Sequence, residues 1–188
     1  MTIHMRRYSA VALFSHDLER VVLIHKLRPA WQADKANFPG GKVEYEDKED
    51  AGFADDDATW LGTDWAATHI NAAVREMHEE TGLTVDAASL TLFCTLRFRI
   101  KALPTAQGEA GECRFYCGVG DVDAAQTRES EPVFVADVDD VLDGQVIDGA
   151  AVTLPTMGNL PWLVAMARQR LRGDVEWRPG YVVEEVVS

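Results

Sequence analysis

Apolar positions along the chain recur mainly with the spacing of short strands. Two apolar runs, 8–14 and 21–24, flank a polar turn and predict a β-hairpin. Residues 90–100 alternate between apolar and polar side chains, which predicts a strand whose even-numbered residues, from Leu92 to Ile100, form one apolar face. Further short strands are expected at 112–119, 132–135 and 181–187, and a loop is expected at 102–111. The last of these strands, 181–187, could instead be a partner-binding arm.

Two longer segments carry the spacing of amphipathic helices. Thr68 is expected to cap the N-terminus of the first, and Gly82 its C-terminus. The second opens at Asn159 with Pro161 in its first turn and runs to about Leu171. The apolar face of the first helix is made by Ile70, Ala73, Val74 and Met77.

The predicted elements follow the order strands, helix, strands, helix, with a short helix at 137–142. This order indicates an α+β fold, with helices packed on a mixed sheet. The length of 188 residues suits a single domain, 1–188. Residues 45–66 are rich in Asp and Glu and lack a clean period, so we expect an inserted acidic loop with a short helical turn.

Three carboxylates end the first helix at positions i, i+3 and i+4, namely Glu76, Glu79 and Glu80. At 3.6 residues per turn they share one face. The helix macrodipole disfavours anions in the last turn by about 0.3–1 kcal/mol each. The face is therefore either a solvated acidic surface or a site for a hard divalent cation, for which Mg²⁺ or Mn²⁺ suits carboxylate ligands best.

The net charge of −13 excludes a basic footprint for nucleic acid polymers, although a small phosphorylated ligand stays compatible with it. The cysteines, Cys94, Cys113 and Cys117, lack metal-binding spacing and favour free thiols in a reducing compartment. Signal-peptide and membrane-spanning patterns are not seen, so a cytoplasmic protein without a membrane partner is expected. A homodimer is left open.

The residues Gly40-Gly41-Lys42-Val43-Glu44 and Arg75-Glu76-Met77-His78-Glu79-Glu80-Thr81-Gly82-Leu83 resemble the signature of the Nudix hydrolase superfamily. The second half of this signature matches at every defined position. The first half departs from it, because the counted position of the first glutamate is Asp47, beside Glu46, and about twenty extra residues follow. The first box glutamate is therefore replaced by Asp47 or Glu46, or is absent.

The resemblance implies an α/β/α sandwich with a mixed sheet between helices. It also implies Mg²⁺- or Mn²⁺-dependent hydrolysis of a nucleoside diphosphate linked to another group. The implied catalytic set is Arg75, Glu76, Glu79 and Glu80, and the implied metal ligands are the three glutamates and the Gly40 carbonyl. Lys42 is the implied phosphate contact. A further acid from a later loop is implied, with Glu109, Glu112, Glu129 and Glu131 as candidates beside the alternative of solvated loop acids.

Asn159 and Trp162 are the clearest indication of substrate in the sequence. Their spacing resembles the purine-binding corner of Nudix enzymes that act on oxidised nucleotides, since an amide can pair with a purine edge and an indole can stack on it. The alternative is that Asn159 caps the helix and Trp162 packs in the core. Trp31 could stack on a base or be structural, and Arg97 and Arg99 could meet phosphates or solvent.

Three functions therefore compete. The first is a (d)NTP pyrophosphohydrolase, with oxidised purine nucleotides as one substrate class. The second is a hydrolase of ADP-ribose, a nucleotide sugar or a dinucleotide. The third is a non-catalytic nucleotide sensor, which has no need of all three acids.

Overall fold

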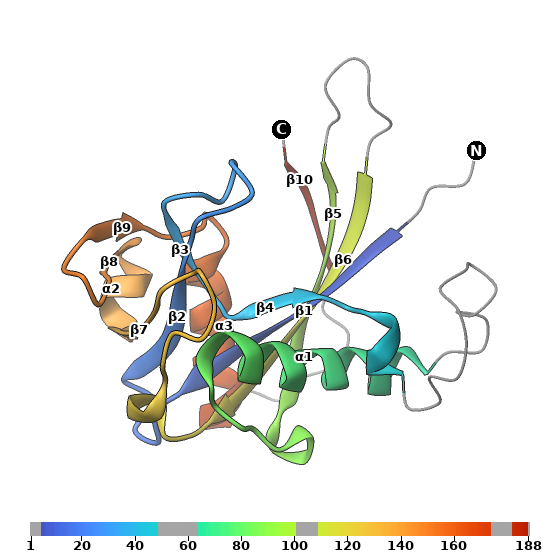
Figure 1. Ribbon diagram of the computed structural model, residues 1–188, viewed down its shortest axis with the longest axis horizontal. Helices are drawn as coiled ribbons and strands as arrows, with labels where there is room; N and C mark the ends of the chain where they lie inside the picture. The colour runs from blue at the N-terminus through green and yellow to red at the C-terminus, as the bar shows by residue number, and fades with distance from the viewer. Residues whose placement is uncertain (1–4, 49–63, 101–108, 174–181, 188) are drawn as a thin grey trace.

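The computed structural model describes residues 5–48, 64–100, 109–173 and 182–187 (Figure 1). Ten strands and three α-helices are seen in these ranges. The strands are β1 (Met5–Phe14), β2 (Arg20–Lys26), β3 (Lys35–Asn37), β4 (Gly40–Lys42), β5 (Thr91–Ile100), β6 (Glu109–Val119), β7 (Val133–Asp137), β8 (Gln145–Ile147), β9 (Thr153–Pro155) and β10 (Val182–Val187). The helices are α1 (Trp65–Thr81), α2 (Val138–Leu142) and α3 (Leu160–Arg172), with 3-10 turns at Tyr45–Asp47, Ala87–Ser89 and Val122–Ala124.

The main sheet is mixed and has β1 at its centre. Its strands lie in the order β10-β5-β6-β1-β2-β3, while β4 pairs with β1 and β7 with β2. β1 runs parallel to β6 from Met5 to Phe14 and antiparallel to β4 and β2. Beyond the Phe14–Val21 pair, β1 and β2 diverge, and β4 pairs with β1 at Tyr8, Ser9 and Ala10.

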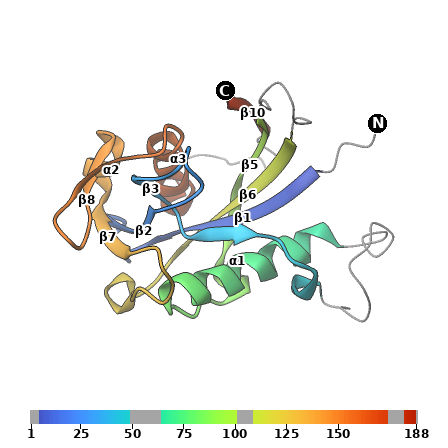
Figure 2. The same cartoon turned by 45° about the horizontal axis from the view of Figure 1, so that its top comes forward.

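Helices cover both faces of this sheet, which gives an α/β/α sandwich (Figures 1 and 2). Along β1, Val11 and Leu13 pack in a cluster with Ala73 and Met77 of α1. On the other face, Ala10, Ala12 and Phe14 pack in a cluster with Leu160, Leu163, Val164 and Ala167 of α3. β1 therefore buries both of its faces, which explains its unbroken apolar run.

The predicted hairpin and the strands that follow it are confirmed. Of the segment 181–187, the described residues 182–187 form a strand, since β10 pairs in parallel with β5. The predicted alternation is wrong at the start of β5, because a β-bulge between Leu92 and Cys94 shifts the pairing with β6. Phe93 is consequently buried, whereas Leu92 is exposed.

The predicted C-terminal cap of α1 is confirmed, but the predicted N-terminal cap is wrong. Gly82 has φ 72° and its N–H donates to the His78 carbonyl. At the other end the cap is Asp64, whose carboxylate accepts from the N–H groups of Ala66 and Ala67. Thr68 lies one turn inside the helix. The insertion is described only at its two ends, where Tyr45–Asp47 forms the expected turn; residues 49–63 lie outside the described ranges.

None of the helices in the described ranges is long and apolar enough to cross a membrane.

Candidate active site

β4 brings two glycines against the carboxylates of α1. The Gly40 N–H donates to Glu80 Oε2 over 2.6 Å. Gly40 has φ 152°, and a Cβ there would lie 2.3 Å from the Ser9 carbonyl oxygen. A Cβ on Gly41 would lie 2.4 Å from the Glu76 carboxylate. Gly40 therefore requires glycine, because a side chain would separate β4 from β1, whereas a side chain at Gly41 would displace the Glu76 carboxylate.

Of the three helix carboxylates, Glu80 is buried and Glu76 is partly buried. Burial raises the pKa of Glu80 to about 8, although the Lys26 ammonium and the Gly40 N–H oppose this shift. Burial also raises the pKa of Glu76, against the charge of Arg75. A cation at this point of the fold would thus stabilise both carboxylates in their charged form.

Arg75 holds the acids of this region in place. Its Nε donates to Asp47 Oδ1 over 2.8 Å and its Nη2 to Asp47 Oδ2 over 3.1 Å. Its Nη1 donates to Glu76 Oε1 over 2.9 Å and to Glu79 Oε2 over 2.8 Å, and its Nη2 also reaches the Lys42 carbonyl oxygen. The hydrogen bond to buried Asp47 is the main reason that the pKa of Arg75 is raised.

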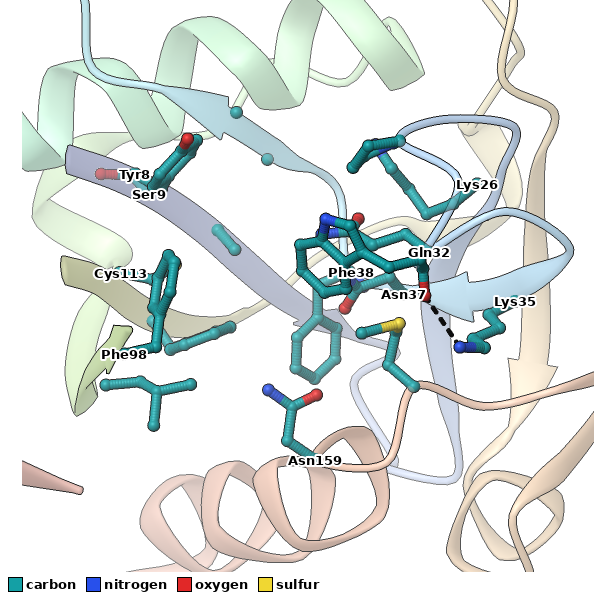
Figure 3. Close-up of a pocket in the computed structure, with 18 of the residues that line it drawn as sticks. Tyr8, Ser9, Lys26, Gln32, Lys35, Asn37, Phe38, Phe98, Cys113 and Asn159 are labelled. Atoms are coloured by element: carbon teal, nitrogen blue, oxygen red, sulfur yellow. Dashed lines mark hydrogen bonds between the residues drawn. The ribbon is translucent and has the colours of Figure 1, made fainter. Parts of the chain in front are cut away.

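A cavity of about 610 Å³ opens beside the two glycines (Figure 3). Its floor is the α3 face of β1, β5 and β6, and its walls are the loop after β2 and the segment before α3. Among the described residues that line it, the charged ones are Arg6, Lys26 and Lys35, and none is an Asp or Glu. In a chain of net charge −13, three cations at one cavity point to an anionic ligand.

Asn159 and Trp162 have different places in the structure. Asn159 lies at the N-cap position of α3, but its side chain makes no capping hydrogen bond. The amide lines the cavity, and its Oδ1 is a buried atom with no hydrogen-bond partner (Figure 3). Trp162 is partly buried against the α3 core cluster and is not among the described residues that line the cavity.

The other residues that were predicted to contact the substrate also lie in different places. The Lys42 side chain is exposed and does not belong to the described cavity lining, whereas Trp31 does. Arg97 pairs with Glu112, its Nε lying 3.1 Å from Glu112 Oε2. The Arg99 side chain lies outside the described residues.

Of the proposed further acids, Glu131 is held by the end of β2 and the loop that follows it. Its Oε1 accepts from the N–H groups of Leu27 and Arg28, and its Oε2 contacts the Lys26 ammonium. Glu131 adds to the raised pKa of Glu80. Exposed Glu129 acts in the same way on Glu76, Glu112 is held by Arg97 and Arg114, and the Glu109 side chain lies outside the described residues.

Sequence comparison identifies no relative: no protein-family model and no curated protein matches the chain. Structural comparison does identify similar folds. The NUDIX domain of Shewanella oneidensis NrtR, solved with ADP ribose, has a TM-score of 0.61 and 18% identity over 90% of each chain. The MutT protein of Bacillus halodurans has a TM-score of 0.54 and 18% identity over 87% of this chain and 82% of its own. A MutT NUDIX hydrolase from Burkholderia pseudomallei gives 0.53 and 17%, over 87% and 98%.

This chain has the Nudix fold. Of the two acids that the sequence offers for the first glutamate of the signature, Asp47 binds Arg75 through both carboxylate oxygens. Glu46 is exposed. The inserted residues therefore enter the chain between Asp47 and α1 without separating the aspartate from the arginine.

The residues at this Nudix site fit a divalent cation in chemistry. Glu76, Glu79, Glu80 and the Gly40 carbonyl offer only oxygen donors, and burial raises the pKa of both Glu76 and Glu80, which a bound cation would oppose. Within the described ranges, no three Asp, Glu, His or Cys side chains are gathered into a ready-made ion site. Arg75 instead holds Glu76 and Glu79.

Among the cavity residues that were not predicted from the sequence are Lys26, Lys35 and Asn37. Lys26 is the residue that ends β2, and Asn37 ends β3, three positions before Gly40. Their proximity to the glycine loop was the available signal. It is weak, because only the folded loop between β2 and β3 shows which of its side chains face the cavity.

Proposed function

We propose that the protein hydrolyses a nucleoside diphosphate linked to another group, with Mg²⁺ or Mn²⁺ as cofactor. The observation that carries this proposal is the meeting of two α1 carboxylates, Glu76 and Glu80, with the Gly40–Gly41 backbone beside a cavity lined with cations. Carboxylates suit a hard cation, cations suit phosphates, and the two kinds of site adjoin at these glycines.

In this function, Lys26 and Lys35 attract the phosphates to the glycine side of the cavity. The ion, when bound, would neutralise phosphate charge and make the attacking water more acidic. Glu80, Glu79, Glu76 and the Gly40 carbonyl would hold that ion. Glu76 or Glu79 would accept the proton of the water that attacks phosphorus. Arg75, fixed by Asp47, would keep these carboxylates in position.

Oxidised purine nucleotides are one substrate class under this proposal. The support is Asn159, whose buried, unpartnered Oδ1 faces ligand space and could accept a hydrogen bond from a purine edge. The Trp162 half of this hypothesis has less support, because that indole packs on the core.

The decisive experiment combines turnover with a binding measurement. With Mg²⁺ and a panel of a nucleoside triphosphate, its oxidised purine analogue, ADP-ribose, a nucleotide sugar and a dinucleotide, we expect Glu79→Gln and Glu80→Gln each to lower kcat at least a hundredfold. Glu46→Gln, which removes an exposed acid next to Asp47, is the matched control and should leave kcat within twofold. Wild-type turnover in either α1 variant would overturn the assignment.

Metal binding has its own measurement. A ligand at a hundred times its Kd stabilises a protein by about 2.7 kcal/mol. At this chain length that raises Tm by roughly 5–10 °C. We expect this shift with Mg²⁺ in the wild type and in Glu46→Gln, and its loss in Glu80→Gln; an equal shift in Glu80→Gln would contradict the metal site.

A non-catalytic sensor is the second candidate. It is favoured by the pairing of Glu76 and Glu79 with Arg75 in place of a gathered ion site, and NrtR of the same fold has been solved with a 27mer DNA as well as with ADP ribose. The net charge of −13 argues against DNA as a partner here. Tight binding of a panel nucleotide with no turnover would support this candidate.

A further inference from the structure

The cavity extends well past the two glycines along β1. Ala10 pairs with Gly40, whereas Arg6, four residues earlier on the same strand, also lines the cavity. At 3.3 Å per residue these positions are roughly 13 Å apart. The loop after β2 lines the cavity from the other direction, so ligand space lies on both sides of the glycine pair.

The end of the cavity at Arg6, Tyr8 and Phe98, which we call the distal end, has an aromatic wall. The rings of Tyr8 and Phe98 are 6.0 Å apart at 37°. They come from β1 and β5, with β6 between them, and Gly111 on β6 is in register with both Arg6 and Phe98. A Cβ on Gly111 would lie 2.3 Å from Phe98 Cζ, so the glycine allows this ring to lie across β6.

The opposite end, which we call the proximal end, is formed by Trp31, Lys35 and Asn37. Trp31 follows Pro29 in the turn between β2 and β3, and its carbonyl accepts from the Lys35 ammonium over 2.8 Å. Figure 3 shows Tyr8 and Phe98 on one side of the cavity and Lys35 and Asn37 on the other. Each end thus combines an aromatic side chain with a cation.

We propose that the substrate is a dinucleoside diphosphate, with one nucleoside at each end and the diphosphate beside Gly40 and Gly41. This inference rests on the proposed function. Aromatic side chains at the two ends favour planar rings, and Lys26, whose charge acts on Glu80 beside Gly40, favours phosphates between them. A nucleoside triphosphate carries one ring system and would leave one aromatic end empty. The cavity volume of about 610 Å³ is within the range of pockets that enclose an extended small molecule.

The reaction is a simple hydrolysis. The oxygen of water bonds to one phosphorus, the bridging P–O bond breaks, and the electron pair of that bond stays on the bridging oxygen. Two nucleoside monophosphates result, and the protons of the water are taken up by the products and by solvent.

The experiment compares diadenosine diphosphate with ATP, which share one base, in the presence of Mg²⁺. We expect the wild type to have a kcat/KM at least tenfold higher for diadenosine diphosphate. Phe98→Leu keeps an apolar side chain but removes the ring, and aromatic pairs contribute up to about tenfold in binding. It should therefore raise KM for the dinucleotide about tenfold, leave its kcat unchanged, and change kcat/KM for ATP by less than twofold.

Trp31→Ala removes the aromatic side chain of the proximal end and should lower the turnover of both substrates. Comparison with Phe98→Leu thereby distinguishes the role of the proximal end from that of the distal end. Far-UV circular dichroism and Tm verify the fold of each variant. Preference for ATP, or an equal loss on both substrates in Phe98→Leu, would overturn this inference while the proposed function stands. If neither compound is hydrolysed, this inference is overturned, while ADP-ribose, the nucleotide sugar and the oxidised nucleotide of the panel above still decide the proposed function.

Discussion

Single residues at the glycine pair determine where the α1 carboxylates can lie. The Glu76 carboxylate fills the space beside Gly41, since it would be 2.4 Å from a Cβ at that position. Gly40 uses its N–H to hold Glu80. The backbone of β4 therefore defines the positions of two acids that belong to a different element.

Gly41→Ala tests this close approach. The new methyl group would displace Glu76, so we expect kcat to fall at least tenfold with a loss of stability below about 2 kcal/mol, since one flexible carboxylate can move away. Turnover and urea unfolding check the two effects. Gly149→Ala is the matched control, because its Cβ would meet only the Phe134 Cβ at 3.9 Å; wild-type kcat in Gly41→Ala would contradict the argument.

The sequence predicts the positions of residues that belong to the motif. It does not predict where a side chain points when this depends on the packing of its element. Arg75 and its acidic neighbours meet the glycine loop as the signature implies. Lys42 ends β4 with its side chain exposed, and Trp162 faces the core. Neither direction follows from composition or spacing, because each depends on how its element packs.

At the scale of elements, one ion pair joins the turn after β4 to the middle of α1. Asp47 is buried, accepts from the Glu44 N–H over 2.7 Å, and binds Arg75 through both oxygens. Its carbonyl also accepts from the Asn71 side chain. The two ends of the acidic insertion are thereby fixed to each other, whatever the length of chain between them.

Asp47→Ala should therefore destabilise the protein by about 3 kcal/mol, since it leaves a partly buried guanidinium without its main partner. Chemical denaturation measures this loss. Asp123→Asn breaks the Arg20 ion pair, whose side chains are 39% and 65% exposed, and should leave the denaturation midpoint close to that of the wild type. Equal losses in the two variants would show that burial of Asp47 has no special effect.

Element boundaries were harder to predict than the elements themselves. The helix that bears the acids was expected from its apolar spacing, but its true cap, Asp64, stands four residues before Thr68 at the end of an acidic stretch with many candidate caps. The bulge at Leu92 and Cys94 leaves no mark on the alternating pattern. Both the cap of α1 and the bulge of β5 are determined by hydrogen-bond geometry.

For the whole molecule, a buried histidine lies between α1 and the sheet. His69 is 0% exposed, and its Nδ1 is 3.0 Å from Ser9 Oγ on β1. Its Nε2 is 4.0 Å from Glu112 Oε1. Burial lowers the pKa of His69 to about 4; the nearby charges of Arg114 and Arg7 also lower it, and that of Glu112 raises it.

The contribution of His69 to the stability of the protein should consequently fall in mild acid. The imidazole is neutral in the folded state down to about pH 4, whereas the unfolded chain takes up the proton near pH 6.5. The stabilisation is complete above pH 6.5 and is lost as the pH falls toward 4, by roughly 3 kcal/mol. Urea unfolding at a series of pH values measures this dependence.

His69→Gln should flatten the pH dependence of unfolding between pH 6.5 and 4, because the amide does not titrate. The exposed His16 provides the control, and His16→Gln should keep the wild-type dependence. The same slope in wild type and His69→Gln would exclude His69 as its source.

The layered fold itself was predictable from the order of strands and helices, but the partners of β1 were not. Ten residue pairs join β1 in parallel to β6, a strand about one hundred positions later in the chain. During synthesis the first strand therefore emerges long before the strand that will flank it. The apolar run of β1 must stay without this neighbour until the ribosome has released residue 119, so we expect slow formation of the sheet and dependence on chaperones during translation.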